Sequence, residues 1–287
     1  MKSVVLHGGI GNQLFQYSFG HYLIQSGFPT NFVFYKKEYE LKHAREILKT
    51  HFPFCEHGDF KLVELPKSRI LRIIKDPTHP RNPLSFFRQN LSNNLNEPFT
   101  IPKVLNSHHL YLGYYQNANM VHNLRNTLIP ELIKAISVSP LGAVEKQLIG
   151  AEVIHFRLGD LLTEKNRQAT GVLDLSYFEN LPSRGANRRV VVTDDLVMAQ
   201  DVLQKLEIDE FFGPEELDVK KTLGVMARSS ILFTGNSTMS WWGGVFAQHL
   251  GGKVYIPDPF YRNVIPHQSP ETYEYPGFSK LPSTFLA

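Results

Sequence analysis

Short apolar runs alternate with polar, turn-forming segments along the chain, and this pattern predicts alternating strands and helices. Near the N-terminus, the run Ser3–Leu6 has the length and composition of a buried strand. Apolar residues then recur at helical spacing from Leu14 until Gly27 ends the predicted helix. A second apolar run, Thr30–Tyr35, follows. A strand, a helix and a strand in this order predict a parallel βαβ unit.

The middle of the chain is less regular. Leu110–Gln116 returns to strand character, and Asn119–Ile136 is predicted to be one helix that Pro130 bends. Before them, Lys61–Lys103 combines repeated prolines with basic side chains. A solvated basic face is the favoured interpretation of this region, and a patch that binds an acceptor or a membrane surface is the alternative.

The second half alternates more cleanly. Its expected strands are Val153–Phe156, Arg189–Thr193, Ile231–Thr234 and Val254–Ile256. Helical patterns separate these strands, so a second parallel sheet is predicted. The segment Ser137–Gly150 contains one proline and two glycines and is the candidate boundary between two domains. We therefore expect an α/β protein with one domain at residues 1–145 and another at 146–287.

Composition places the chain among ordinary globular proteins, with 42% hydrophobic and 20% charged residues. The net charge of +3 argues against a nucleic-acid partner, which requires a clustered basic face. The single cysteine, Cys55, rules out an internal disulfide and favours a reducing compartment. No leader pattern and no apolar run of about 18 residues is present. We expect a cytoplasmic protein, and peripheral association with the inner face of the membrane is the alternative.

Polar side chains follow three strands of the second half. They are His155, Arg157 and Asp160; Asp194 and Asp195; and Asn236, Ser237 and Thr238. If these strands are neighbours, the three groups meet in the crevice at the carboxyl ends of the sheet. Arg157 can bind two phosphate oxygens at once, and the helix start near Thr238 offers N–H groups and hydroxyls to the same kind of ligand. The two aspartates suit hydrogen bonds to a base or a ribose, so the crevice suits a nucleoside diphosphate.

Each of these groups also has a purely structural interpretation. Arg157 and Asp160 could form a buried pair that only joins the strand to its neighbours, and Asp194 could be a helix N-cap. At the other end of the chain, Gly11, Asn12 and Gln13 lie in a glycine-rich turn that offers backbone and amide donors to an anion. This turn lacks the third glycine of a dinucleotide fingerprint, and a tight turn whose amides cap the helix is its alternative interpretation.

Other site chemistries are poorly represented. The chain has no Asp-x-Asp triplet and no His-x-x-x-His spacing, so no metal site is expected. The Gly-x-Ser-x-Gly elbow of serine hydrolases is absent as well.

Four segments in this order resemble the hallmark blocks of the bacterial galactoside α-1,2-fucosyltransferases. They are Gly8-Gly9-Ile10-Gly11-Asn12-Gln13-Leu14-Phe15-Gln16-Tyr17, Gly113-Tyr114-Tyr115-Gln116, His155-Phe156-Arg157-Leu158-Gly159-Asp160 and Asn236-Ser237-Thr238-Met239-Ser240-Trp241-Trp242-Gly243. The resemblance implies a GT-B architecture, in which two Rossmann-like domains face each other across a cleft. It implies inverting transfer of fucose from GDP-β-L-fucose to the 2-hydroxyl of a terminal β-galactoside, without a metal or other cofactor.

The resemblance also assigns roles to residues. It implies that Arg157 grips the diphosphate, flanked by His155 and Asp160, and that Asn12 reaches the fucose and diphosphate from the N-terminal domain. The other donor-binding positions that it implies are Gly11, Gln13, Asp194, Asp195, Asn236, Ser237, Thr238 and Ser240. Leu158 is a departure, since many relatives carry a second arginine there.

Three points stay open at the level of the sequence. The base that accepts the proton of the acceptor hydroxyl could be Glu164, Asp160 or Asp174, or the leaving phosphate. The pair Trp241-Trp242 could stack on a ligand, although two aromatic residues on a helix more often belong to the core. The alternative functions are a transferase for another nucleotide sugar and a non-catalytic carbohydrate- or nucleotide-binding protein. The oligomeric state is not predicted.

Overall fold

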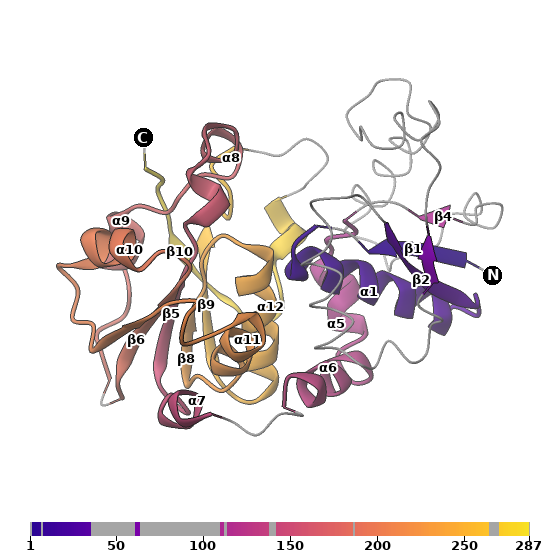
Figure 1. The fold of residues 1–287 in the computed structure, drawn as a ribbon, viewed down its shortest axis with the longest axis horizontal. Coiled ribbons are helices and arrows are strands. Elements are labelled where there is room, and N and C mark those ends of the chain that lie inside the picture. The colour runs from indigo at the N-terminus through magenta and orange to yellow at the C-terminus, as the bar shows by residue number, and fades with distance from the viewer. Residues whose placement is uncertain are drawn as a thin grey trace. The chain divides into compact units, whose positions relative to one another are not determined.

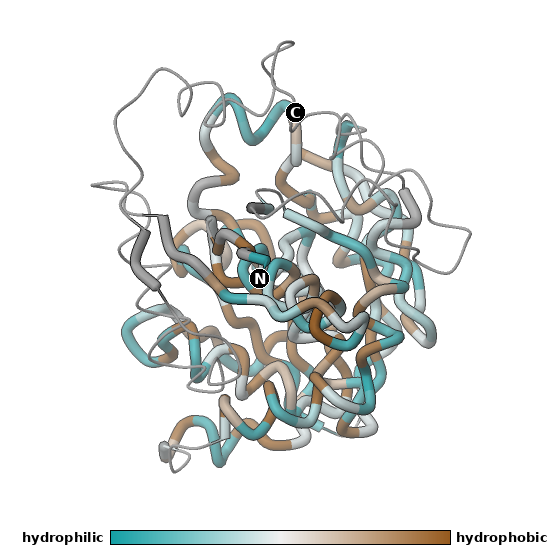
Figure 2. The backbone as a smooth tube through the Cα atoms, turned by 90° about the vertical axis from the view of Figure 1, so that its right-hand side faces the viewer, coloured by the Kyte–Doolittle hydropathy of each residue, from teal (hydrophilic) through white to brown (hydrophobic). Residues whose placement is uncertain are grey.

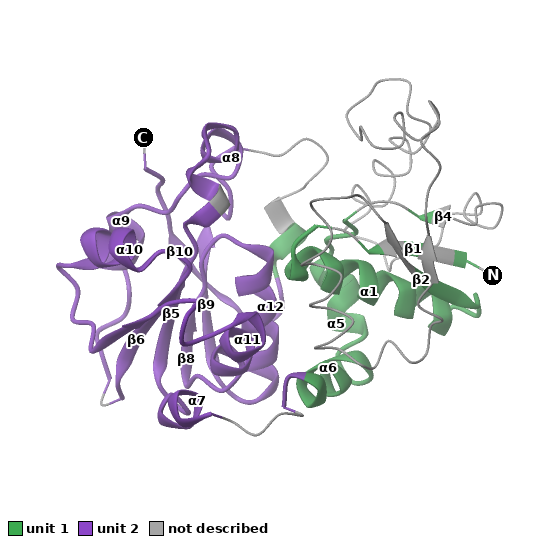
Figure 3. Cartoon of the chain, viewed as in Figure 1, with its two compact units in different colours: residues 1–135, 267–274 green, residues 136–266, 275–287 purple. Residues whose placement is uncertain are grey.

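The computed structural model describes residues 2–6, 8–35, 61–63, 110–111, 114–137, 142–185, 187–263 and 270–286. The chain divides into two compact units (Figure 3). The first contains Met1–Ala135 and His267–Glu274, and the second contains Ile136–Pro266 and Tyr275–Ala287. The change of unit thus comes ten residues before the predicted boundary at residue 145, and a short C-terminal segment returns to the first unit. The reason for the earlier boundary is that α7 (Ala143–Gln147) packs against α11 (Val219–Ala227) of the second unit.

The described strands of the first unit form one parallel sheet in the order β3-β2-β1-β4. These strands are β1 (Lys2–Leu6), β2 (Thr30–Tyr35), β3 (Lys61–Val63) and β4 (Leu110–Tyr111). Helix α1 (Ile10–Gln25) connects β1 to β2 and packs on both (Figure 1). The predicted βαβ unit is confirmed.

The helix expected at Asn119–Ile136 is wrong as a single element. The structure has α5 (Ala118–Asn123) and α6 (Leu128–Ser137), with a turn between them. Pro130 lies in the first turn of α6, where a backbone N–H has no intrahelical acceptor and its loss therefore costs nothing. Proline begins a helix here rather than bending one.

The second unit has a parallel sheet in the order β10-β9-β8-β5-β6-β7. Its strands are β5 (Glu152–Phe156), β6 (Arg189–Thr193), β7 (Glu210–Phe212), β8 (Ile231–Phe233), β9 (Lys253–Asp258) and β10 (Ser279–Pro282). Counted from β5, this is the strand order of the Rossmann fold, and the order in the first unit matches the first four strands of that fold. Two Rossmann-like units are therefore confirmed, and their facing each other across a cleft stays a prediction.

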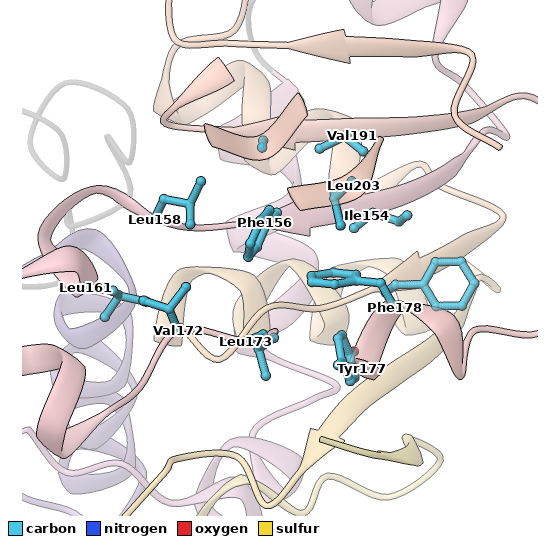
Figure 4. Close-up of a cluster of buried hydrophobic side chains, with 12 residues drawn as sticks. Ile154, Phe156, Leu158, Leu161, Val172, Leu173, Tyr177, Phe178, Val191 and Leu203 are labelled. Carbon is cyan, nitrogen blue, oxygen red and sulfur yellow. The ribbon is translucent and has the colours of Figure 1, made fainter. Parts of the chain in front are cut away.

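Helices cover both faces of the second sheet. One face carries a hydrophobic cluster that includes Ile154, Phe156 and Val191, and it packs under α9 (Leu175–Glu179) and α10 (Leu196–Leu203) (Figure 4). On the other face, α11 packs on β5, and α12 (Thr238–His249) packs on β8 and β9. Along the described chain, hydrophobic segments alternate with hydrophilic ones (Figure 2), as this layered arrangement requires. The remaining described elements are η3 (Gly159–Leu162), α8 (Glu164–Ala169) and η4 (Pro270–Tyr273).

A buried ion pair joins β5 to β6 at the amino ends of the strands. Arg189 and Glu152 lie opposite each other in the ladder, 2.8 Å separates Arg189 Nη2 from Glu152 Oε2, and their side chains are 9% and 1% exposed. Glu152 also accepts a hydrogen bond from the N–H of Gly185, and Arg189 donates to the carbonyl of Pro182. The pair is fully bonded and lies at the edge of the sheet opposite to the predicted crevice.

Of the basic, proline-rich region Lys61–Lys103, only the strand β3 is described. Apart from Lys61–Val63, the region Lys61–Lys103 lies outside the described residues, and the prediction made for it is not addressed. None of the helices in the described part of the chain is long and apolar enough to cross a membrane.

Candidate functional site

The strands that carry the predicted site residues are neighbours. β5 lies between β8 and β6, and all three run parallel. Their carboxyl ends therefore meet at one edge of the sheet, as expected from the sequence. The strand order reverses between β5 and β8, and this switch point is where open α/β sheets bind ligands.

At the end of β5, successive side chains alternate between the core and the opposite face. Phe156 and Leu158 point into the hydrophobic cluster (Figure 4), so His155 belongs to the face on which α11 and α12 pack. Leu158 is completely buried there, which accounts for an apolar residue at this position. Arg157 follows the strand and is half-buried.

His155 is an uncharged histidine. Burial, together with the nearby positive charge of Arg157, lowers the pKa of its imidazole to about 3. Its Nδ1 is buried and has no hydrogen-bond partner among the described residues, and the same holds for the hydroxyl of Thr234 at the adjacent position after β8. A neutral imidazole can accept or donate one hydrogen bond at this edge but adds no charge to it.

The two aspartates after β6, Asp194 and Asp195, have different structural roles, which the sequence alone did not distinguish. Asp195 is the N-cap of α10, since its carboxylate accepts the N–H of Met198 at 3.1 Å. Asp194 is exposed and accepts the N–H of Leu158 at 2.7 Å. A side chain at Gly159 would collide with that carboxylate. Asp194 therefore fastens the loop after Arg157 to the neighbouring strand, and the N-cap role predicted as its alternative belongs to Asp195.

The loop between β8 and α12 is closed by its own polar side chains. Ser237 is the N-cap of α12 and accepts the N–H of Ser240, whose own buried hydroxyl accepts the N–H of Gly235 at 2.8 Å. Asn236 donates to the carbonyls of Thr170 and Gly171. Thr238, the first residue of the helix, is partly exposed. The hydroxyls predicted to face phosphate are thus mostly engaged within the loop, and the free N–H groups of the helix start are the stronger anion donors.

A glycine brings this loop close to β5. A side-chain carbon at Gly235 would lie 2.7 Å from the backbone oxygen of His155. Real side chains do not tolerate such a distance to a rigid carbonyl, so only glycine lets the two segments approach. The close approach places the start of α12 beside the end of β5.

The first unit repeats this arrangement at its own switch point, between β1 and β4. Gly8 follows β1 with a φ of 78°, and Asn12 lies in the first turn of α1. The side-chain Nε2 of Gln116, which follows β4, donates to Asn12 Oδ1 at 2.8 Å. Gln13 is fully buried and donates to the carbonyl of Gly8 at 2.8 Å. Gln13 therefore holds the turn in shape, while Asn12 is half-buried beside it.

The candidate bases differ in availability. Glu164 is exposed in the first turn of α8. Asp174 caps α9 and accepts hydrogen bonds from Ser176 and Thr284; burial opposes ionisation, but these bonds outweigh it and lower the pKa of the carboxyl group. The side chain of Asp160 lies outside the described residues. Of the two candidates whose side chains are described, Glu164 is therefore less engaged in structural hydrogen bonds than Asp174.

Trp241 and Trp242 belong to the core. Both are completely buried, and their rings meet edge to face with centroids 5.4 Å apart. This confirms the structural interpretation of the pair. Among the described residues, no group of three or more His, Cys, Asp or Glu side chains is arranged to hold a metal ion.

Comparisons with known proteins show similarity to a glycosyltransferase. No protein-family model matches the chain. It is 23% identical over 267 residues to the O-antigen biosynthesis glycosyltransferase WbnK from Escherichia coli, covering 83% of this chain and 87% of the relative. This similarity supports glycosyltransferase activity and leaves the donor and the acceptor open.

Similar solved structures include a glycosyl transferase family 9 protein from Veillonella parvula, with a TM-score of 0.46, 12% identity and coverage of 99% of this chain and 87% of that one. The ADP-heptose lipopolysaccharide heptosyltransferase II of Escherichia coli has a TM-score of 0.46, 10% identity and coverage of 98% and 90%.

Sequence reasoning missed two features of these edges. Gln116 lies in a segment quoted for its resemblance, yet it was given no role, and Tyr273, which bonds to it, lies 157 positions further along the chain. A sequence carries no periodic or local signal for such a distant side-chain contact. The buried pair of Arg189 and Glu152 was missed because both residues stand at strand ends, where charged side chains are usually solvated.

Proposed function

We propose that the protein is an inverting glycosyltransferase that moves L-fucose from GDP-β-L-fucose to the 2-hydroxyl of a terminal β-galactoside. One observation carries the proposal: all four segments that resemble the fucosyltransferase blocks lie at or after the carboxyl ends of the strands that flank the two switch points. These strands are β1 and β4 in the first unit and β5 and β8 in the second. The similarity to a curated glycosyltransferase supports the reaction class. The donor and the linkage rest on the resemblance.

The second unit is assigned the nucleotide diphosphate. Cleavage of the fucose–phosphate bond leaves negative charge on GDP, and donors that are already aimed at that charge lower the barrier most. Arg157 offers a bidentate fork, and the first N–H groups of α12 have no intrahelical acceptor. Asp194 holds the backbone directly after Arg157, so it supports the position of the guanidinium.

The acceptor must approach the face of the sugar opposite to the departing phosphate. A galactose hydroxyl held about 3 Å from the anomeric carbon is in position for a single displacement, which converts the β-linked donor into an α-linked product. The proton of that hydroxyl passes to a base or to the leaving phosphate, and the exposed carboxylate of Glu164 supports its choice over Asp174 as that base. The basis for proposing a bacterial surface oligosaccharide as acceptor is the role of the relative in O-antigen biosynthesis.

The proposal is tested by incubating the purified protein with GDP-fucose and lactose or N-acetyllactosamine and measuring GDP release. GDP should appear much faster with both substrates than with the donor alone, and the product should gain the mass of one fucose. GDP-mannose and UDP-galactose serve as competing donors. Faster transfer from either would identify a transferase for another nucleotide sugar, and binding without any release would identify a non-catalytic protein.

A metal-independent reaction is part of the same proposal. Excess EDTA should leave the rate unchanged, because Arg157 and the helix start are proposed to take the place of a cation at the diphosphate. Loss of activity in EDTA with recovery on adding Mn²⁺ or Mg²⁺ would contradict this.

A further inference from the structure

Three polar side chains from distant parts of the chain form a relay in the first unit. Tyr273, the last residue of η4, donates its hydroxyl hydrogen to Gln116 Oε1 at 2.9 Å. The other end of the same amide, Nε2, donates to Asn12 Oδ1 at 2.8 Å. Along the chain, Tyr273 comes after α12, Gln116 comes after β4, and Asn12 lies in the first turn of α1. All three residues belong to the first unit.

The backbone around Gln116 is held in an uncommon conformation. Tyr115 has a φ of 50°, which residues other than glycine seldom adopt. Its ring stacks on Phe19 of α1, with centroids 4.0 Å apart and an angle of 9° between the planes. Such strain persists where the surroundings fix it, and here the stack turns the chain so that Gln116 meets Asn12.

The relay determines which end of the Asn12 amide faces away from it. A carboxamide has one accepting oxygen and one donating nitrogen, and the Asn12 oxygen is already used by Gln116. Its Nδ2 group has no hydrogen-bond acceptor among the described residues. Gly8 lies next to this nitrogen, and a side chain at Gly8 would stand only 3.3 Å from it. The glycine therefore keeps one side of the amide uncovered.

We infer that Gln116 and Tyr273 are positioning residues that orient the Asn12 amide, so that Nδ2 donates to an accepting oxygen of the bound substrate. The inference rests on the proposed function, in which this oxygen belongs to the fucose or to the diphosphate of the donor. Tyr273 fixes Gln116, and Gln116 fixes Asn12. Substrate binding then requires no reorientation of the amide, which is the advantage of a preorganised donor.

The central test compares two substitutions of Gln116. In Gln116→Glu the carboxylate can only accept, so Asn12 must rotate and donate Nδ2 to it, which turns Oδ1 toward the substrate. In Gln116→Met the amide of Asn12 is merely released. We expect kcat/KM for the donor to fall about 100-fold in the first variant and about fivefold in the second, with similar melting temperatures.

A structural role alone predicts a different order. The apolar Met would then disturb the polar cluster at least as much as Glu, and activity would follow the melting temperature. Equal loss in the two variants, or a larger loss in Gln116→Met, would overturn the inference. Gln25→Met is the matched control, because it removes a glutamine–threonine hydrogen bond of the same unit at an exposed position of α1.

Tyr273→Phe tests the outer member of the relay. It should lower kcat/KM about threefold in the otherwise unchanged protein and less than about 1.5-fold when Asn12 is already alanine, because coupled residues are not additive. Tyr22→Phe on α1 is the control. A loss of the same size in both backgrounds would show that Tyr273 does not act through Asn12.

The position of the accepting oxygen follows from inhibition by GDP, which has the diphosphate but no fucose. If GDP inhibits Asn12→Ala less strongly than it inhibits the wild-type protein, the oxygen belongs to the diphosphate. If inhibition by GDP is unchanged but the use of GDP-fucose is impaired, the oxygen belongs to the fucose. Both results support the orienting role, whereas an Asn12→Ala variant with unchanged kinetics would overturn it.

The orientation of the amide can also be followed without turnover. In ¹⁵N spectra of the free protein, the Asn12 side-chain resonances, identified by their loss in Asn12→Ala, should shift in Tyr273→Phe and stay in place in Tyr22→Phe. No shift in Tyr273→Phe would contradict the relay. If the wild-type protein does not transfer fucose but the shift occurs, the proposed function fails and the relay stands.

Discussion

Two arginines on neighbouring strands of the second sheet lie at opposite edges and in opposite environments. Arg189, at the amino edge, is 7% exposed and bonds to Glu152 and to the carbonyl of Pro182. Arg157, at the carboxyl edge, is half-buried beside a neutral His155. The neighbouring strand β8 leads into α12, whose N-terminus also favours negative charge.

The difference contrasts a buried, paired arginine with an arginine at the edge that is proposed to bind the donor. At the amino edge a cation and an anion are buried together and satisfy each other. At the carboxyl edge a permanent cation stands next to a helix N-terminus and to a histidine that burial keeps uncharged, so the edge is suited to a negatively charged ligand. Under the proposed function, the two arginines serve different purposes, and the edge of the sheet at which each lies predicts which.

The largest expected effect is on catalysis, in Arg157→Lys. Lysine keeps the charge but cannot form the bidentate fork, so kcat/KM for GDP-fucose should fall about 100-fold or more with little change in melting temperature. Arg189→Lys is the matched control and should show the reverse: a lower melting temperature and nearly normal activity of the folded protein. Activity of Arg157→Lys within a few-fold of wild type would refute the diphosphate role.

The second largest effect is on stability, in Glu152→Gln. Removing one charge leaves Arg189 buried and unpaired, which should lower the free energy of unfolding by about 3 kcal/mol. Urea denaturation followed by circular dichroism measures this, and the Michaelis constants at a permissive temperature should not change. A loss below about 1 kcal/mol would mean that the pair is solvated in solution.

A third effect concerns pH. Because the pKa of His155 is about 3 in the folded protein and about 6.5 when unfolded, the unfolded state binds the extra proton first as the pH falls. This contribution to stability is fully present above pH ~6.5 and is lost progressively below it, amounting to about 2 kcal/mol between pH 7 and pH 5.

The comparison that isolates this term is His155→Gln. Burial and Arg125 also lower the pKa of His122, so wild-type stability falls with acidity for more than one reason. The difference between wild type and His155→Gln should therefore change by about 2 kcal/mol over the same range. A pH-independent difference would show that His155 is accessible and titrates normally.

The smallest effect distinguishes a cap from a ligand contact at Asp195. Asp195→Ala should lower the free energy of unfolding by about 1 kcal/mol, and Asp195→Ser should restore most of it, because serine also caps helices. If Asp195 only caps α10, both variants keep a normal Michaelis constant for the donor. Recovery of stability in Asp195→Ser without recovery of donor binding would instead place its carboxylate on the nucleotide.

The sequence was sufficient for the α/β class, the parallel sheets and the meeting of three strand ends, because these follow from apolar runs and from turn residues at their ends. It was not sufficient where tertiary contacts decide. Nothing near Asp194 or Asp195 indicates which of them caps the helix, since either position has the right chemistry. Tyr273 could not be found at all, because its partner is remote and its own segment has no pattern.

The measurement that tests the account most directly is proton NMR of the isolated product formed from GDP-fucose and lactose. The account predicts one new fucose in the α-anomeric form, attached to the 2-hydroxyl of galactose. α-Fucose on another hydroxyl would overturn the acceptor assignment alone. A β-anomeric fucose would contradict the inverting displacement, and the absence of any fucosylated product would contradict the proposed function.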